Sequence, residues 1–297
     1  MTINTCKVDM HVHSRYSHRP SSWILKKIGC AECYTEPLDA YQLLKNRGMG
    51  LVTLTDHNTI DGCLEIAHLP DTFISEEVTT YFPEDKCKLH VLVYNITEKQ
   101  HEDISRFRNN VFDLVDFLNI EKIVHAIAHP MYSVNGLLQA HHLEQFFLLF
   151  QNWELNGARD SLQNQIVARI INGLTEETIT RLADFYDINP CVSRLWDKCL
   201  ISGSDDHSSL YLGLSYTEVA GASSVETFLS GIRQRRNTVK THNATPETLA
   251  HNIYSIMYQF YNDEFQVNRW INDTDLTNFF RDTLLTKSFT HAATTKP

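Results

Sequence analysis

The chain has 297 residues, 42% of them hydrophobic, and its 26 basic and 36 acidic residues give a formal net charge of −10. This length is sufficient for one large α/β domain with an extension, because barrels of 200–250 residues ordinarily form single domains. The acidic balance argues against a dedicated nucleic-acid-binding protein, and no apolar run approaches the ~18 residues of a membrane span.

Short β-type runs alternate with helix-type runs along the chain. In chain order, we predict a strand at 6–12, a helix at 37–46, a strand at 51–55, a helical or coil segment at 59–68, strands at 73–78 and 89–95, a helix at 97–118, a strand at 123–128, a helix at 142–150, a strand at 152–155, helices at 161–173 and 175–186, strands at 200–204 and 216–219, and a helix at 225–235. Strands that alternate with helices predict parallel βαβ units.

The pattern changes after residue 242, where helical periodicity continues without a strand signal. We predict helices at 246–261 and 276–285 and a disordered tail after them. The expected division is a barrel domain at 1–242, a helical extension at 243–285 and a tail at 286–297. Apolar residues of the extension recur at helical spacing and need burial. We therefore expect the extension to pack against the outside of the barrel or a partner, and not against the barrel mouth.

The segment at 18–36 is long and poorly periodic, and we expect it to form a loop over the mouth of the barrel. It contains Cys30 and Cys33 in a CxxC motif, which without a second pair is weak evidence for a structural zinc site. The chain has seven cysteines, an odd and scattered set that indicates reduced thiols. Because residues 1–9 also show no signal-peptide pattern, we expect a cytoplasmic location.

Residue types that bind metals end or follow several of the predicted strands. The nine candidate ligands are His11, His13, His18, His57, Glu77, His90, His129, Asp205 and His207. In a β/α barrel the carboxyl ends of the strands meet at one face, and that face carries the active site. An open doubly wound sheet would not bring seven strand ends around one point. We therefore predict a closed or nearly closed β/α barrel that holds a multinuclear metal centre.

The spacing of these candidates supports a shared site. His11 and His13 lie two residues apart in a predicted strand, so their side chains face the same side. Asp205 and His207 repeat this spacing, and the carboxylate of Glu77 is suited to bridge two ions. A single histidine after a strand is more often a loop or core residue than a metal ligand. The prediction of a metal site therefore depends on the whole set of candidates and not on any one of them. Imidazoles with a few carboxylates suit Zn, Fe or Mn better than Ca or Mg.

The ordered motifs resemble those of the PHP (polymerase and histidinol phosphatase) domain family. The matching segments are His11-Val-His13-Ser14, Thr55-Asp56-His57-Asn58, Glu77, His90-Val-Leu92, Ala128-His129-Pro130 and Gly203-Ser204-Asp205-Asp206-His207. The resemblance runs from about residue 6 to 242. It implies a distorted seven-stranded (β/α)7 barrel with three divalent metal ions at the C-terminal face of its strands.

The resemblance also implies a distribution of the ligands. The first ion is expected at His11, His13, Glu77 and Asp205, the second at Glu77, His90 and His129, and the third at His18, His57 and His207. The family varies at the position of His18. The loop at 30–36 and the helical extension resemble a subgroup of bacterial stand-alone PHP proteins, some of which are linked to glycosyltransferases. The candidate protein partners are therefore a second copy of the chain or a glycosyltransferase-linked partner.

Clustered divalent ions generate hydroxide near neutral pH and stabilise the charge that develops on a phosphoryl group. We therefore expect Glu77, Asp205 and His207 to be catalytic as well as metal-binding. Phosphate recognition also needs arginines outside the metal shell, because guanidinium grips phosphate with a planar fork. The candidates for this role are Arg15, Arg19 and Arg159.

Three functions remain open from the sequence. The leading prediction is a metal-dependent hydrolase that acts on the phosphate monoester of a small molecule. The second is a phosphodiesterase or nuclease that acts on nucleotides or nucleic-acid ends, and the third is a non-catalytic, metal-bound regulatory module. The net charge of −10 and the lack of a basic aromatic stripe count against long nucleic acids. The presence of every ligand type counts against the third function.

Overall fold

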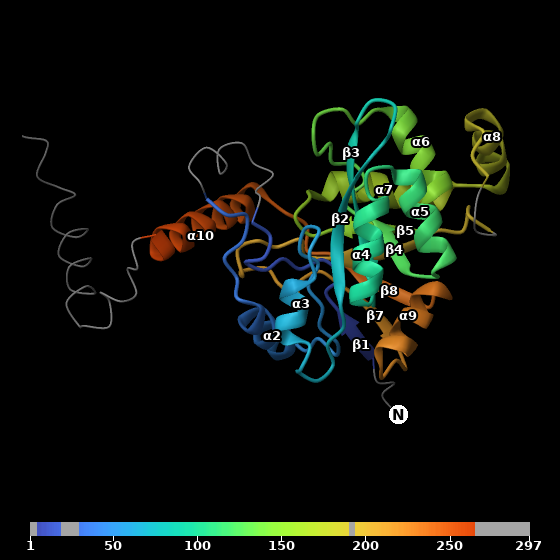
Figure 1. Cartoon of the computed structure of the whole chain (residues 1–297). Helices are drawn as coiled ribbons and strands as arrows, with labels where there is room; N and C mark the ends of the chain where they lie inside the picture. The colour runs from blue at the N-terminus through green and yellow to red at the C-terminus, as the bar shows by residue number, and fades with distance from the viewer. Residues whose placement is uncertain (1–4, 19–29, 190–193, 265–297) are drawn as a thin grey trace, which may run out of the picture.

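The computed structural model describes residues 5–18, 30–189 and 194–264, and these form a mixed α/β structure with two sheets. The larger sheet contains β2 (Ser75–Tyr81), β3 (Lys88–Tyr94), β4 (Val124–Ile127), β5 (Asn152–Asn156) and β6 (Cys199–Gly203), in that order. The smaller sheet has the order β1-β7-β8 and contains β1 (Thr5–Val8), β7 (Tyr216–Ala220) and β8 (Asn237–Lys240). Figure 1 shows both sheets with their surrounding helices.

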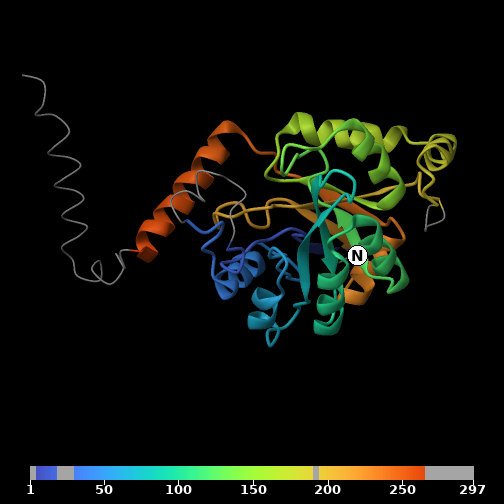
Figure 2. The same cartoon turned by 45° about the horizontal axis from the view of Figure 1, so that its top comes forward.

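Nine helices lie in the described part of the chain. They are α2 (Pro37–Asn46), α3 (Asp61–Ile66), α4 (Glu98–Phe107), α5 (Val111–Ile120), α6 (Ala140–Leu149), α7 (Ser161–Gly173), α8 (Glu176–Tyr186), α9 (Val225–Arg233) and α10 (Pro246–Glu264). In Figures 1 and 2, α10 extends away from the sheets on one side of the molecule. None of the helices among the described residues has the length and apolar character needed to cross a membrane.

The expectation of parallel βαβ units holds for only part of the larger sheet. The pairs β4–β5 and β5–β6 are parallel, but β2–β3 and β3–β4 are antiparallel. The reason is the length of the connection between β2 and β3, which runs only from Phe82 to Cys87. A parallel crossover needs a dozen or more residues, so this segment forms a hairpin.

The prediction of one continuous helix at 97–118 is wrong, because two helices, α4 and α5, occupy this segment. Thr97 begins α4 with the capping box expected from the sequence, in which Gln100 is the partner. The break comes at Asn110, which has an extended backbone with φ −141° and accepts a hydrogen bond from the backbone N–H of Phe112. The side chain of Asn110 therefore caps α5. Asn110 also separates α5 from α4, because an N-cap residue is not itself helical.

The strand predicted at 51–55 is not formed as a ladder, and β8 was not predicted. Residues 51–57 instead make two isolated parallel bridges, Val52 to Thr72 and His57 to Glu77. A third bridge joins Val12 to Asp206. The bridge at Val12 joins the segments that follow β1 and β6, and the bridge at His57 joins its segment to β2. A closed seven-stranded ring of ladders is not present among the described residues. The bridges nevertheless bring residues 11–13, 57, 77 and 205 to one place.

Strand β3 is buried on both faces, and this fixes the direction of its first histidine. Val91 and Val93 pack into the core that contains Leu114 of α5, whereas Leu92 and Tyr94 pack into the core that contains Met10 and β6. His90 has the same parity as Leu92 and Tyr94, so it faces the region between the two sheets. Because β3 runs antiparallel to β4, its beginning lies at the carboxyl end of β4.

Candidate metal centre

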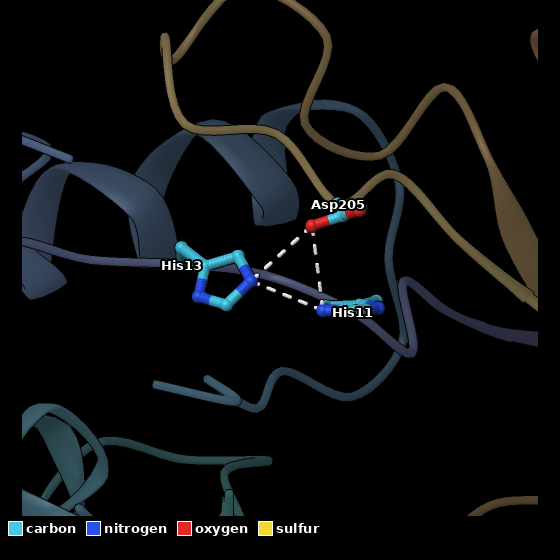
Figure 3. Close-up of side chains that lie close together, drawn as sticks. All are labelled: His11, His13 and Asp205. Carbon is cyan, nitrogen blue, oxygen red and sulfur yellow. Dashed lines mark hydrogen bonds and ion pairs between the residues drawn. The ribbon is translucent and has the colours of Figure 1, made fainter. Parts of the chain in front are cut away.

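The side chains of His11, His13 and Asp205 converge on one point (Figure 3). The Nε2 atoms of the two histidines lie 3.0 Å apart, and Oδ1 of Asp205 lies 3.4 Å from the first and 3.3 Å from the second. Both histidines are fully buried. Tetrahedral ligands bound about 2.0–2.1 Å from zinc would lie about 3.4 Å from one another. These three atoms therefore have the spacing of ligands to one ion.

Glu77 connects this group to a second one. Its Oε2 lies 3.3 Å from Nε2 of His11 and 3.4 Å from Nε2 of His13. Its Oε1 lies 2.9 Å from Nδ1 of His90 and 3.0 Å from Nε2 of His129. The two oxygens of this buried carboxylate thus face two separate sets of imidazoles, as a bridging ligand requires.

Two of the converging residues have a left-handed backbone, with φ +29° at His129 and +51° at Asp205. Such conformations are strained for residues other than glycine and are maintained by surrounding contacts. The backbone N–H of His129 donates to Oε2 of Glu154 over 2.7 Å, and that of Asp205 donates to the carbonyl of His11 over 2.8 Å. Buried hydrogen bonds at the site therefore maintain the strained backbone conformations of His129 and Asp205.

Glu154, in β5, is a site residue that the sequence analysis missed. Its Oε1 lies 2.8 Å from Nδ1 of His11, and its Oε2 accepts a hydrogen bond from Nδ2 of Asn156 over 2.9 Å. Asn156 also donates to Asp205 over 3.0 Å. The contact with Glu154 places a ring proton of His11 on Nδ1 and leaves Nε2 directed at the site, as in a metal-binding histidine that is oriented by a carboxylate.

A third set of side chains surrounds His57. Its Nδ1 lies 2.9 Å from Oε2 of Glu77, and its Nε2 lies 3.1 Å from Oε2 of Glu32. His207 stacks on His13 with ring centroids 4.2 Å apart, and its Nε2 lies 3.5 Å from Oδ1 of Asp205. The structure therefore brings together eight of the nine predicted ligands and adds Glu32, which sequence reasoning missed.

His18 is the predicted ligand that lies apart from the others. Its side chain is exposed, and its ring centroid is 6.3 Å from that of Tyr16. In the described part of the chain, its one hydrogen bond joins its backbone N–H to the carbonyl of Tyr16. The ring makes no polar contact with the other candidate ligands among the described residues.

Burial and charge together set the protonation of these groups. Burial raises the pKa of Glu77, but the charges of His57, His90 and His11 outweigh this effect and hold its pKa well below the usual range. Burial, reinforced by the charge of His207, lowers the pKa of His13 to about 3. Burial also lowers the pKa of His90 to about 4, against the attraction of Glu77. Burial lowers the pKa of His11, but the charges of Glu154, Asp205 and Glu77 outweigh this effect and raise it well above the usual range; the pKa of His57 is raised likewise, against burial, chiefly by the charge of Glu77. Metals bind the ionised carboxylate and the neutral imidazole, so binding of a cation here would displace protons from these histidines.

Several buried polar atoms at the site make no hydrogen bond with any described residue. They are Oε2 of Glu77, Nδ1 of His57, Nδ1 of His90 and Nδ1 of His207; the 2.9 Å contacts of His57 and His90 with Glu77 do not have hydrogen-bond geometry. Buried polar atoms are normally satisfied, so unsatisfied ones need an explanation such as an ion. The donor set consists of imidazole nitrogens and carboxylate oxygens, which fits Zn, Fe or Mn.

The three candidate arginines have different positions. Nη2 of Arg159 lies 3.7 Å from Oδ2 of Asp205, and its guanidinium lies 3.8 Å from the ring centroid of Tyr132. Arg15 is half exposed and pairs with Glu36 over 3.1 Å and with Glu65 over 3.5 Å. Arg19 lies outside the described residues. Arg159 is thus the described arginine that borders the ligand cluster.

Buried aspartates near the ligands hold the backbone in place. Asp9 accepts hydrogen bonds from the backbone N–H groups of His11, Ser204 and Gly213, and contacts no imidazole. Asp56 accepts from the backbone N–H of Ser14 over 2.7 Å. Asp9 therefore holds the segments that carry His11, Ser204 and Gly213 together.

A second group of metal-type residues, Asp85, His141 and His142, lies away from this centre. Nδ1 of His142 accepts the backbone N–H of Gln139 at the start of α6, over 3.0 Å. Its Nε2 therefore carries the proton and donates to Asp85 over 3.1 Å. This histidine caps a helix and has no free lone pair, so the group is not a convincing metal site.

The cysteine prediction is consistent with the structure as far as it is described. Six cysteines lie among the described residues, and all six are buried and free. Cys33 Sγ donates to the carbonyl of His13 over 3.5 Å. The CxxC motif therefore packs beside the site, and no second thiol pair joins it in the described part of the chain.

Comparisons with known proteins leave the family open. No family model matches the chain. A segment of 72 residues is 38% identical to the uncharacterized protein MJ1587 of Methanocaldococcus jannaschii, and it covers 24% of this chain and 40% of that protein. The chain thus spans less than half the length of the curated relative that it matches.

Three solved structures have similar overall shapes at low sequence identity. PsfC from Pseudomonas syringae is 14% identical, with a TM-score of 0.49 over 86% of this chain and 98% of its own. A two-domain Bacteroides vulgatus protein that contains a predicted PHP-like metal-dependent phosphoesterase is 13% identical, with a TM-score of 0.49 over 85% and 70%. The lesion-specific endonuclease PfuEndoQ from Pyrococcus furiosus is 15% identical, with a TM-score of 0.48 over 80% and 58%. All three TM-scores are below 0.5, so the functional interpretation depends on the side chains of the chain itself.

Proposed function

We propose that the protein is a metal-dependent phosphoesterase of the PHP type, which hydrolyses the phosphate monoester of a small molecule with three divalent ions, Zn, Fe or Mn. The proposal includes a distorted seven-stranded barrel, which the mixed sheet and the bridges between segments support. The observation that carries it is the placement of Glu77, whose two oxygens face the imidazoles of His11 and His13 on one side and of His90 and His129 on the other.

The ligand sets would follow the geometry of the side chains. His11, His13, Glu77 and Asp205 would hold one ion, and Glu77, His90 and His129 would hold a second. Divalent ions in such a cluster supply a water of lowered pKa and neutralise phosphoryl oxygens. Asp205 and His207 lie 3.5 Å apart in this cluster, and the proposal gives both a role beside the attacked phosphorus.

Arg159 supports phosphate as the substrate group. Its guanidinium is held by the face of Tyr132 on one side and by Asp205 on another. Its Nε makes no hydrogen bond with the described residues, although it is buried. A guanidinium has five N–H donors in a fixed plane, so Arg159 retains donors for the phosphoryl oxygens of a substrate. Arg15 faces two glutamates instead, so we assign it no such role.

A monoester is favoured over a long nucleic acid by charge. The chain has a net charge of −10, and non-specific nucleic-acid binding depends on clustered cations. Arg159 is the candidate arginine that borders the cluster, with Nη2 3.7 Å from Oδ2 of Asp205. One such cation suits a single phosphate group rather than a charged backbone.

The test is a hydrolysis screen over phosphate monoesters and diesters, with Mn²⁺, Fe²⁺ and Zn²⁺ supplied separately. We expect metal-dependent release of phosphate from monoesters by the wild-type chain and none by Asp205→Asn. Preferential cleavage of diesters would transfer the assignment to the phosphodiesterase alternative. A fully metallated protein that hydrolyses neither class would support the non-catalytic module and contradict the proposal.

A further inference from the structure

Glu32 places a buried carboxylate beside His57, a residue expected to bind the third ion of the proposed centre. Glu32 is 4% exposed, and its Oε2 is 3.1 Å from Nε2 of His57. The rings of His57 and His207 both pack against that of His13, with centroids 4.8 Å and 4.2 Å from it. The carboxylate of Glu32 therefore lies beside the imidazoles proposed for the third ion.

The loop that contains Glu32 is anchored on both sides of the cluster. The thiol of Cys33 donates to the carbonyl of His13, and the backbone N–H of Arg15 donates to the carbonyl of Thr35 over 2.8 Å. The hydroxyl of Thr35 also contacts that of Ser209 over 2.5 Å, two residues after His207. The position of Glu32 is thus fixed by the same segments that carry His13 and His207.

The two nitrogens of His57 face two different carboxylates. Nδ1 lies 2.9 Å from Glu77 and Nε2 lies 3.1 Å from Glu32. Imidazoles that bind metals commonly donate one ring N–H to a carboxylate and use the other nitrogen for the ion. Of the two nitrogens, Nε2 is the one beside Glu32, so it is the nitrogen that an ion held together with Glu32 would contact.

We propose that Glu32, and not His18, completes the third ion position together with His57 and His207. This inference rests on the proposed metal centre and changes its ligand set. A carboxylate in place of an imidazole adds one negative charge next to three divalent ions. The ligands of the third ion then come from three distant segments, so its binding also joins the loop at 30–36 to the segments that carry His57 and His207.

The experiment measures bound metal in the purified full chain by mass spectrometry, after loading with Zn²⁺ or Mn²⁺ and removal of free ions. The variants are Glu32→Gln, Glu32→Asp and, as the matched control, His18→Gln. We expect three ions in the wild type and in His18→Gln, and two in Glu32→Gln. In Glu32→Asp, the weakest of three titrated Zn²⁺ affinities should fall at least about tenfold while the other two are unchanged.

Circular dichroism and thermal unfolding establish that each variant is folded, and Glu32→Asp retains the charge if Glu32→Gln does not fold. Three ions in Glu32→Gln, unchanged affinities in Glu32→Asp, or loss of an ion in His18→Gln would overturn the assignment of Glu32. A wild-type chain that binds two ions and hydrolyses monoesters would also overturn it and leave the proposed function intact. A wild-type chain that binds no ions would overturn both.

Discussion

The carboxylate of Glu154 lies 2.8 Å from Nδ1 of His11, and both side chains are fully buried. The same carboxylate accepts the backbone N–H of His129, whose φ is +29°. One side chain of β5 therefore sets the tautomer of a ligand in one proposed ion site and the backbone of a ligand in another. It is a positioning residue, because its oxygens face protein groups.

Glu154→Gln should weaken metal binding by about 10- to 100-fold, the usual effect of losing an outer carboxylate that orients a ligand. The amide keeps the volume of the side chain but replaces one acceptor by a donor, so it cannot satisfy both His11 and His129. The measurement is a Zn²⁺ titration of the metal-free chain. The exposed Glu102→Gln on α4 is the control, and equal affinities in the two variants would contradict the positioning role.

Gly203→Ala should damage the site, because a Cβ at this position would lie 2.3 Å from the backbone nitrogen of His11. Overpacking of this kind typically costs about 1–3 kcal/mol. Gly173→Ala is the matched control, since a Cβ there meets nothing within 4 Å. Thermal unfolding and metal content of both variants give the comparison. A Gly203→Ala chain with native stability and full metal content would show that the strands can separate without loss of the site.

Arg159→Ala should weaken binding of phosphate by about 10- to 100-fold, the equivalent of about 1.5–3 kcal/mol for one charge-assisted contact. Arg159→Lys should restore binding only in part, because an ammonium cannot reproduce the planar fork. The measurement is the inhibition constant of inorganic phosphate with metal content verified in each variant. Equal constants in wild type and Arg159→Ala would mean that this arginine only packs on Tyr132.

Removal of residues 246–297 should loosen the segment that follows His207. We expected the extension to avoid the barrel mouth, but Ser255 of α10 donates to the carbonyl of Ser208 over 2.9 Å, and Asn252 accepts from the hydroxyl of Ser208 over 2.7 Å. Ile256 is buried. Hydrogen exchange over residues 207–211 should increase in the truncated chain. Unchanged exchange there would show that α10 does not restrain this segment.

The sequence predicted most elements of the fold because their signals are local. The helix at 37–46 and the pair at 161–173 and 175–186 agree with α2, α7 and α8 to within one residue. The antiparallel hairpin of β2 and β3 was not predicted, although the connection between them, Phe82 to Cys87, is too short for a parallel crossover. The general alternation of strands and helices along the chain favoured parallel pairs instead. The break at Asn110 was missed because the apolar periodicity continues across it.

The candidate site was predictable where residue type and spacing coincide. His11 and His13 were expected on one face, and their Nε2 atoms lie 3.0 Å apart. Glu154 could have been noticed as a carboxylate inside a predicted strand, a place where burial requires a partner. Glu32 offered no such signal, because it lies in a loop without periodicity and reaches His57 only through the tertiary fold.

The most direct test of the metal centre is the number of ions bound to Glu77→Gln. The two glutamates of β2 supply a matched pair, because Glu76 has the opposite parity and its Oε1 lies 2.9 Å from Nδ1 of His101 on α4. We predict that Glu77→Gln loses at least two ions and all hydrolytic activity, whereas Glu76→Gln retains the wild-type metal content. A folded Glu77→Gln chain with full metal content and unchanged turnover would contradict the proposed centre.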